Sequence, residues 1–202
     1  MKITILVEGR TEKAFMPHLR RFLTHRLAGR PMPHLDPFPC DGRVYKGEKL
    51  RRTVEHLLLR RPKSDAVIAL TDVYTGTNDF HDAADAKRKM REWVGPAEKF
   101  YPHAAQHDFE AWLLPYWSEI QVVAGHKKGP PPGSPERVNH KRPPSSYIRE
   151  IFEIGTCRDS YSKTRDATRI LTGKDLQVAA DKCPELKALL NTILGLCGAE
   201  LL

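Results

Sequence analysis

Long apolar segments are absent from this sequence of 202 residues. No run approaches the ~20 apolar residues that a membrane-spanning helix needs. The first apolar run ends at Glu8, which is too early for a signal peptide. We therefore expect a cytoplasmic protein with no membrane partner.

Cysteine is scarce, and the motifs of several protein classes are missing. The four cysteines never form C-x-x-C, which argues against a zinc ribbon. They could form two disulfides, but without a secretion signal we expect reduced thiols. There is no G-K-[ST] and hence no P-loop. No zinc finger or RNA-binding aromatic motif is present, so sequence-specific base reading is not expected.

The charge balance is strongly basic. Lys and Arg number 33 against 25 Asp and Glu, which gives a net charge of +8 and a pI near 9.4. Such an excess favours polyanionic partners, with nucleic acid first and an anionic membrane second. The alternative is a basic but merely solvated surface.

Strand patterns alternate with helical ones in the first half of the chain. Residues 3–7 and 65–72 are apolar runs rich in β-branched residues, as expected for strands buried on both faces. Helical spacing predicts helices after Thr11, over 46–61 and over 82–95, with Pro17 predicting a kink or a later start. A third strand is expected over 103–109, with a helix starting near Glu110. This order predicts an open, mostly parallel α/β sheet flanked by helices.

The remaining segments are less regular. Residues 28–40 are rich in proline, and a strand hidden there cannot be placed from the sequence. Residues 126–146 break all periodicity and predict a surface loop. Helices are expected over 145–153, 163–171 and 184–196. We therefore divide the chain into an α/β core, 1–125, and a basic loop with a small C-terminal helical extension packed on it, 126–202.

Acidic residues occur where each predicted strand ends. Glu8 follows the first strand, Asp72 ends the second, and Asp108 and Glu110 lie at the third. Carboxyl ends of parallel strands share one edge of a sheet, where ligand crevices form. Clustered carboxylates need protons or a divalent cation, and an all-oxygen set suits Mg²⁺ or Mn²⁺. The alternative is that these acids are turn formers and helix caps, and for Glu12 a plain first-turn acid is equally open.

These motifs carry a family resemblance. "ILVEGRTE" followed by a helix and then "IALTDVYTG" resembles the Toprim fold of topoisomerases, primases and overcoming-lysogenization-defect nucleases. The chain is still more similar to a Toprim-like family, the domain of unknown function 4276. The matching stretches cover most of the chain in order: "VEGRTE", "DGRVYKG", "TDVYTG", "QHDFEAWLL", "SPERVNHKRPPSSYI" and "YSKTRDATRI".

The resemblance implies a Toprim-like fold and metal-dependent cleavage of nucleic-acid phosphodiesters, in a defence or repair system. It makes Glu8 and Asp72 the catalytic residues, with Glu8 as general acid or base. Both are also metal ligands, and Asp108 and Glu110 are further ligands. Because this chain has no ATP-binding motif, a separate ATPase subunit is an implied partner. Tyr74 stands where Toprim proteins have a second Asp. Either Asp108 or Glu110 supplies the missing charge, or the site binds metal weakly or serves binding alone.

Two basic segments are candidates for holding the nucleic-acid backbone, with DNA favoured over RNA. The first precedes a predicted helix, whose N-terminal amides favour phosphate; the second lies in the proline-rich loop. The candidate residues are Arg43, Lys46, Lys127, Lys128, Lys141 and Arg142. In each segment the alternative is a solvated basic surface.

Two other functions remain open from the sequence. The protein could be a non-catalytic partner that binds an ATPase or nucleic acid, with the acids serving structure. It could also be a metal-dependent phosphohydrolase or nucleotidyl transferase acting on a small molecule, which the basic loop disfavours. Divalent-ion binding distinguishes the first of these from an enzyme.

Overall fold

A four-stranded parallel sheet forms the centre of the molecule. The computed structural model describes residues 1–73, 79–138, 142–156 and 160–202. The strands lie in the order β2 (His34–Pro39), β1 (Lys2–Val7), β3 (Ala66–Asp72) and β4 (Phe100–Ala105), and every pair is parallel. The predicted α/β fold with a parallel sheet is thus confirmed.

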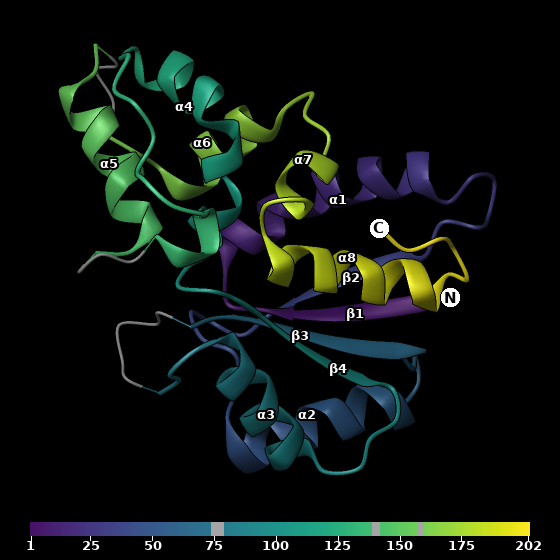
Figure 1. Ribbon diagram of the computed structural model, residues 1–202. Coiled ribbons are helices and arrows are strands. Elements are labelled where there is room, and N and C mark those ends of the chain that lie inside the picture. The colour runs from purple at the N-terminus through teal and green to yellow at the C-terminus, as the bar shows by residue number, and fades with distance from the viewer. Residues whose placement is uncertain (74–78, 139–141, 157–159) are drawn as a thin grey trace.

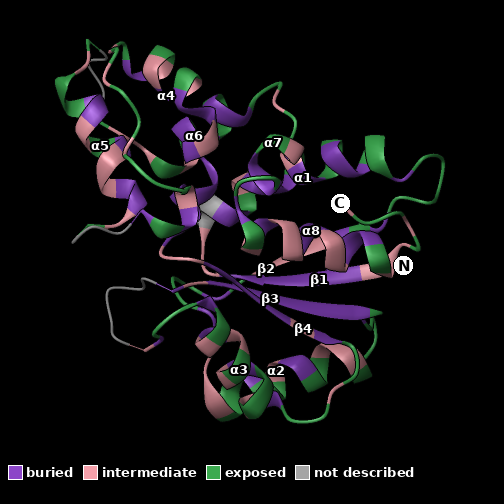
Figure 2. Ribbon diagram, in the orientation of Figure 1, coloured by how far each residue is buried: buried purple, intermediate pink, exposed green. Residues whose placement is uncertain are grey.

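Both faces of the sheet are buried, which explains the continuous apolar runs of its central strands. Alternate residues of β1 belong to different cores: Ile3, Ile5 and Val7 to one, and Leu6 to the other. β3 alternates in the same way. Figure 2 shows the central strands as buried along nearly their whole length.

Two layers of helices cover these faces (Figure 1). Helices α2 (Gly47–Leu59) and α3 (Ala83–Val94) cover one face. Helices α1 (Arg10–Arg26) and α8 (Pro184–Leu196) cover the other. Each helix presents apolar residues to the sheet at helical spacing, such as Leu50 and Val54 of α2.

The other helices gather beyond the carboxyl ends of the strands, on the side of α1 and α8 (Figure 1). They are α4 (Trp117–Ala124), α5 (Pro144–Ile154), α6 (Lys163–Leu171) and the short α7 (Gln177–Ala180). Three 3₁₀ turns precede or separate them: η1 (Phe109–Trp112), η2 (Leu114–Tyr116) and η3 (Pro135–Arg137). Their apolar residues join the core beneath α1 and α8. A boundary between residues 125 and 126 stays a prediction.

Several predicted elements differ in extent. Helix α1 begins at Arg10 and contains Pro17 at an exposed position, so the expectation of a later start is wrong. β4 covers Phe100–Ala105 instead of 103–109, and a 3₁₀ turn over Phe109–Trp112 lies where a helix was expected to start near Glu110. The predicted helices over 163–171 and 184–196 match α6 and α8.

Strand β2 forms one edge of the sheet, and this position explains why its sequence can be rich in proline. The amide of His34 donates to the carbonyl of Met1, just before β1, and the amide of Cys40 donates to the carbonyl of Val7, at the end of β1. The backbone groups of the alternate residues of β2 therefore point away from the sheet. Pro37 and Pro39 occupy two of those outward positions and carry no amide hydrogen. The outward carbonyl of Leu35 accepts a hydrogen bond from Arg20 Nη2 at 2.8 Å.

Two expectations from the sequence concern the environment of the chain. No helix within the described ranges has the length and apolarity needed to cross a bilayer. Cys40, Cys183 and Cys197 carry free thiols. Cys157 lies outside the described residues, as do Tyr74 and Lys141.

Candidate acidic site

Glu8 links the ends of the two central strands. It follows β1, and its backbone carbonyl accepts a hydrogen bond from Gly42 N at 2.6 Å. Its carboxylate Oε1 accepts hydrogen bonds from the Thr71 hydroxyl and from Asp72 N, the latter at 3.0 Å. Burial raises the pKa of Glu8 to about 7, although these two hydrogen bonds oppose the rise. Glu8 is therefore held in place by β3 and is poised to exchange a proton near neutral pH.

Asp72 ends β3 and is surrounded by other acids. Burial and then repulsion from four carboxylates raise its pKa well above the usual range. These neighbours and Asp72 itself form what we call the acidic cluster: Glu8, Glu12, Asp72, Asp108 and Glu110. The structure thus brings all four sequence-predicted acids into one electrostatically interacting group.

Glu12 is a first-turn acid that caps α1, and it also lies near the other acids, while a functional role for it stays a prediction. Its carboxylate Oε2 accepts a hydrogen bond from Gly9 N at 2.9 Å, which caps the first turn of α1. The side chain is also buried, and burial raises its pKa. A capping acid that interacts with Glu8, Asp72 and Glu110 belongs to the cluster as well as to the helix.

Asp108 enters the cluster from the turn after β4. His107, with φ of 72°, adopts the left-handed conformation, and the chain turns there into η1. Asp108 Oδ2 accepts a hydrogen bond from Ser145 N, near the start of α5, at 3.1 Å. Its other oxygen, Oδ1, is buried and has no hydrogen-bond partner among the described residues. Burial, and then repulsion by Glu110, raises the pKa of Asp108 to about 6.

Glu110 is fully buried, and a lysine holds its carboxylate. Lys163 Nζ lies 3.0 Å from both carboxylate oxygens of Glu110. The Tyr161 hydroxyl donates to Oε1 at 3.2 Å. Burial alone would lower the pKa of Lys163, but attraction to Glu110, Asp72 and Asp108 outweighs it and raises that pKa. Lys163 thus neutralises part of the charge of the cluster.

Sequence reasoning missed Lys163. It begins a correctly predicted helix, but it lies 53 residues from Glu110. Only the packing of α6 against α1 places it here. The single signal in the sequence was its position in "YSKTRDATRI", one of the stretches that carry the family resemblance.

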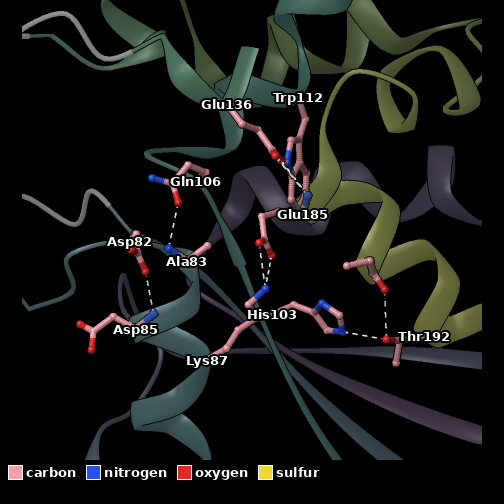
Figure 3. A network of polar contacts seen from close by, with 11 residues as sticks. Asp82, Ala83, Asp85, Lys87, His103, Gln106, Trp112, Glu136, Glu185 and Thr192 are labelled. Atoms are coloured by element: carbon pink, nitrogen blue, oxygen red, sulfur yellow. Dashed lines mark hydrogen bonds and ion pairs between the residues drawn. The ribbon is translucent and has the colours of Figure 1, made fainter. Parts of the chain in front are cut away.

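A polar network beside β4 supports η1 (Figure 3). Trp112 of η1 donates its indole N–H to Glu136 at 3.1 Å. Both carboxylate oxygens of Glu136 also accept the amide of Glu185, at 3.2 and 3.1 Å, in the first turn of α8. Glu185 in turn binds Lys87 of α3 at 2.8 and 2.6 Å. The network ties the turn that carries Glu110 to helices of both layers.

The donor chemistry of the cluster fits a hard divalent cation. Carboxylate oxygens are the ligands that Mg²⁺ and Mn²⁺ prefer. The buried, unpartnered Asp108 Oδ1 is an available ligand atom. In the part of the chain that the structure describes, however, no three His, Cys, Asp or Glu side chains are grouped to hold an ion as they stand. A single ion shared by Glu8, Asp72 and Asp108 or Glu110 therefore stays a prediction.

The predicted basic residues divide into two groups. Arg43 and Lys46 line a small hollow with Glu8 and Thr71, next to the cluster, and Lys46 pairs with Asp79. Across the site, Lys128 and Arg142 both pair with Glu150, which offsets part of their charge. Arg142 also lies over the Tyr147 ring at 4.2 Å. Lys127 lines a surface hollow beside α4.

Comparison with solved structures supports the fold. The C-terminal region of the Burkholderia pseudomallei OLD protein matches with a TM-score of 0.54 at 12% identity, over 97% of this chain and 98% of that one. The C-terminal region of the Xanthomonas campestris pv. campestris OLD protein gives 0.49 at 13% identity, over 97% and 95%. At these identities the likeness concerns the fold alone.

Comparison with family models identifies the family of this chain. The family described as "Domain of unknown function (DUF4276)" matches residues 7–194. Among curated proteins no sequence matches.

Proposed function

This chain belongs to the DUF4276 family, and we propose that it is a Toprim-like, metal-dependent nuclease that cleaves nucleic-acid phosphodiesters. The observation that carries the proposal is the convergence of five acids and Lys163 at the carboxyl edge of the sheet. Acids gathered for structure alone would be expected to find separate partners, because mutual repulsion costs free energy. Asp72 instead interacts unfavourably with four others.

The residues would divide the chemistry as follows. Asp72 and Asp108, with Glu110, would hold Mg²⁺ or Mn²⁺. The bound ion would offset charge on the phosphate and lower the pKa of a water molecule. Glu8, with its pKa near 7, would move a proton at the attacking or leaving oxygen. Lys163, partly exposed, would contact a phosphate oxygen with its ammonium group.

We propose the partners of this protein from its net charge and from its fold likeness to the C-terminal region of an OLD protein. The chain's net charge of +8 favours nucleic acid. We propose DNA ahead of RNA as the substrate. No ATP-binding motif is present in the sequence, so a separate ATPase subunit would supply any nucleotide hydrolysis, as expected for a defence or repair system. The fold likeness to the C-terminal region of the Burkholderia pseudomallei OLD protein supports this proposal.

The test is Mn²⁺-dependent cleavage of labelled DNA and RNA by the purified chain. Asp72→Asn should abolish cleavage, whereas Glu98→Gln, which also removes a single negative charge but at an exposed position outside the cluster, should cleave like wild type. The proposal is wrong if wild type cleaves neither substrate with Mg²⁺ or Mn²⁺, or if Asp72→Asn cleaves normally.

One observation favours a second candidate, a non-catalytic partner that binds nucleic acid or an ATPase. Both Glu110 oxygens are already engaged by Lys163, and no ready ion-binding group is seen within the described residues. Calorimetric titration with Mn²⁺ separates the two. Binding that Asp72→Asn removes supports the enzyme, whereas an absence of binding supports the partner protein.

A further inference from the structure

One side of α2 carries a row of basic residues that the acidic site does not use. We call Lys49, Arg52, His56 and Arg60 the α2 basic face; Arg60 is the residue at which the helix ends. They recur every three or four residues, so they lie on the same side of the helix. All four are exposed, while the helix buries Leu50 and Val54 against the sheet.

Surface hollows run along this face and begin beside the acidic cluster. Lys49, Arg52 and His56 line one hollow, and Arg52, His56 and Arg60 line the next, so the two adjoin. Lys49 Nζ lies 3.7 Å from the centre of the Tyr45 ring. Tyr45 itself lines the hollow that also contains Glu8, Arg43 and Lys46. Basic side chains therefore continue from the cluster along the length of α2.

The charge of the molecule is concentrated in this segment. Residues 43–63 contain eight Lys and Arg against two Glu, a net charge of +6 in a chain whose total is +8. Arg51, on the flank of the helix, pairs with both acids, Glu48 at 2.8 Å and Glu55 at 3.6 Å. Of the basic face, Arg52 also pairs with Glu48, at 2.8 Å. Lys49 and Arg60 have no carboxylate partner in the described part of the chain. Positive charge is thus left free on the basic face.

The length and direction of α2 suit the backbone of a nucleic acid. The helix starts at the carboxyl edge of the sheet, where Glu8 lies, and runs away from it (Figure 1). With a rise of ~1.5 Å per residue, residues 49–60 span ~17 Å. Successive phosphates of one DNA strand advance ~3.4 Å along the duplex axis, so the face extends over about five base pairs.

We infer that the α2 basic face binds the phosphate backbone of duplex DNA beside the bond presented to the acidic cluster. The inference rests on the proposed nuclease function. A duplex fits better than a single strand because, of the four side chains of the face, only His56 carries an aromatic ring on which a base could stack. In the alternative loop, Lys128 and Arg142 share Glu150 and offer less free charge.

The test compares two variants of the full chain with the same change in net charge. The first is Lys49→Gln/Arg52→Gln/Arg60→Gln. The control is Arg51→Gln/Arg88→Gln/Arg91→Gln, which removes three exposed arginines from α2 and α3 outside the hollows. Affinity for a labelled duplex of about 20 base pairs is measured by fluorescence anisotropy over a range of salt, with EDTA present so that no cleavage occurs.

The first variant should bind at least about tenfold more weakly than wild type, and its slope of log K against log salt should decrease by roughly 2–3. The control should keep most of the affinity and slope. Equal losses of duplex affinity in the two variants would mean that net charge alone explains binding, and this would overturn the inference. So would wild type binding anionic vesicles but no duplex.

The cleavage assay separates this inference from the proposed function. If wild type and the first variant cleave duplex DNA with the same KM, the nuclease stands and the binding face is wrong. If duplex binding depends on the face but no divalent ion supports cleavage, the binding face stands and the nuclease is wrong.

Discussion

The surroundings of Glu8 allow a catalytic role to be distinguished from a structural one. Its pKa near 7 means that its charge is unfavourable in the folded state, as expected where function retains a destabilising group. Glu8→Gln keeps an oxygen for Thr71 and Asp72 N while removing the charge. Without metal, the melting temperature should be unchanged or higher, while Mn²⁺-dependent cleavage should decrease by about 10²–10⁴-fold. A much lower melting temperature would instead identify Glu8 as a structural residue.

Lys163 should stabilise the protein when no metal is bound. Lys163→Met leaves the fully buried Glu110 without its cation, so the free energy of unfolding should decrease by about 1–3 kcal/mol, less than for a completely buried pair because Lys163 is partly exposed. Lys174→Met is the matched control, because its partner Glu119 is partly exposed and lies away from the cluster. The control should lose at most about 1 kcal/mol. Urea unfolding in EDTA measures both, and equal losses would contradict the role given to Lys163.

His103 should make the protein sensitive to acid. Burial, with Lys87 and Arg91 nearby, lowers its pKa from 6.5 to about 4. The folded state therefore favours neutral imidazole, and stability that is present above pH 6.5 is lost as the pH falls towards 4. The loss from this group between pH 7 and pH 4.5 should be about 2–3 kcal/mol.

His103→Leu should remove this contribution. The buried Nδ1 has no partner in the described residues, and Thr192 retains its hydrogen bond to the Ala188 carbonyl. The measurement is the pH dependence of unfolding free energy for wild type and variant. Because the acidic cluster titrates in both proteins, the difference between the two curves reports on His103 alone. Parallel curves would contradict the assigned shift.

At the scale of elements, α8 depends on a cap supplied from outside the helix. Glu136 accepts both the Glu185 amide and the Trp112 indole N–H. Glu136→Ala would leave both donors unpaired, so we expect the free energy of unfolding to decrease by roughly 2–4 kcal/mol. Glu136→Gln keeps one acceptor oxygen and should lose less. Thermal unfolding of the two variants tests this, and similar losses would mean that packing rather than hydrogen bonding holds α8.

Elements were predictable where apolar periodicity was strong. The sequence shows apolar runs in β1 and β3 and apolar residues at helical spacing in α6 and α8. These patterns are strong because each of these elements buries apolar side chains. β2 was not predictable, because its prolines mask the strand pattern at a sheet edge. The end of β4 was missed because the turn depends on His107 adopting a positive φ, which a non-glycine residue rarely does.

At the scale of the whole molecule, part of the site followed from topology alone. Parallel strands bring their carboxyl ends to one edge, so the meeting of Glu8 with Asp72 could be predicted. The contribution of Lys163 could not, because it depends on how α1 and α6 pack together. The α2 basic face was present in the spacing of residues 49, 52, 56 and 60, but its continuity with the acidic edge needed the structure.

The outer edge of β2 has a consequence for self-association. A strand from another molecule would need backbone N–H donors at positions 37 and 39, but both residues are prolines. It would also need the Leu35 carbonyl as an acceptor, but this carbonyl already accepts a hydrogen bond from Arg20. Strand-by-strand growth into cross-β aggregates is therefore blocked at this edge by main-chain chemistry. A protein that binds at this edge must therefore do so through side chains, because the outer backbone of β2 does not offer the hydrogen-bonding groups that an added strand needs.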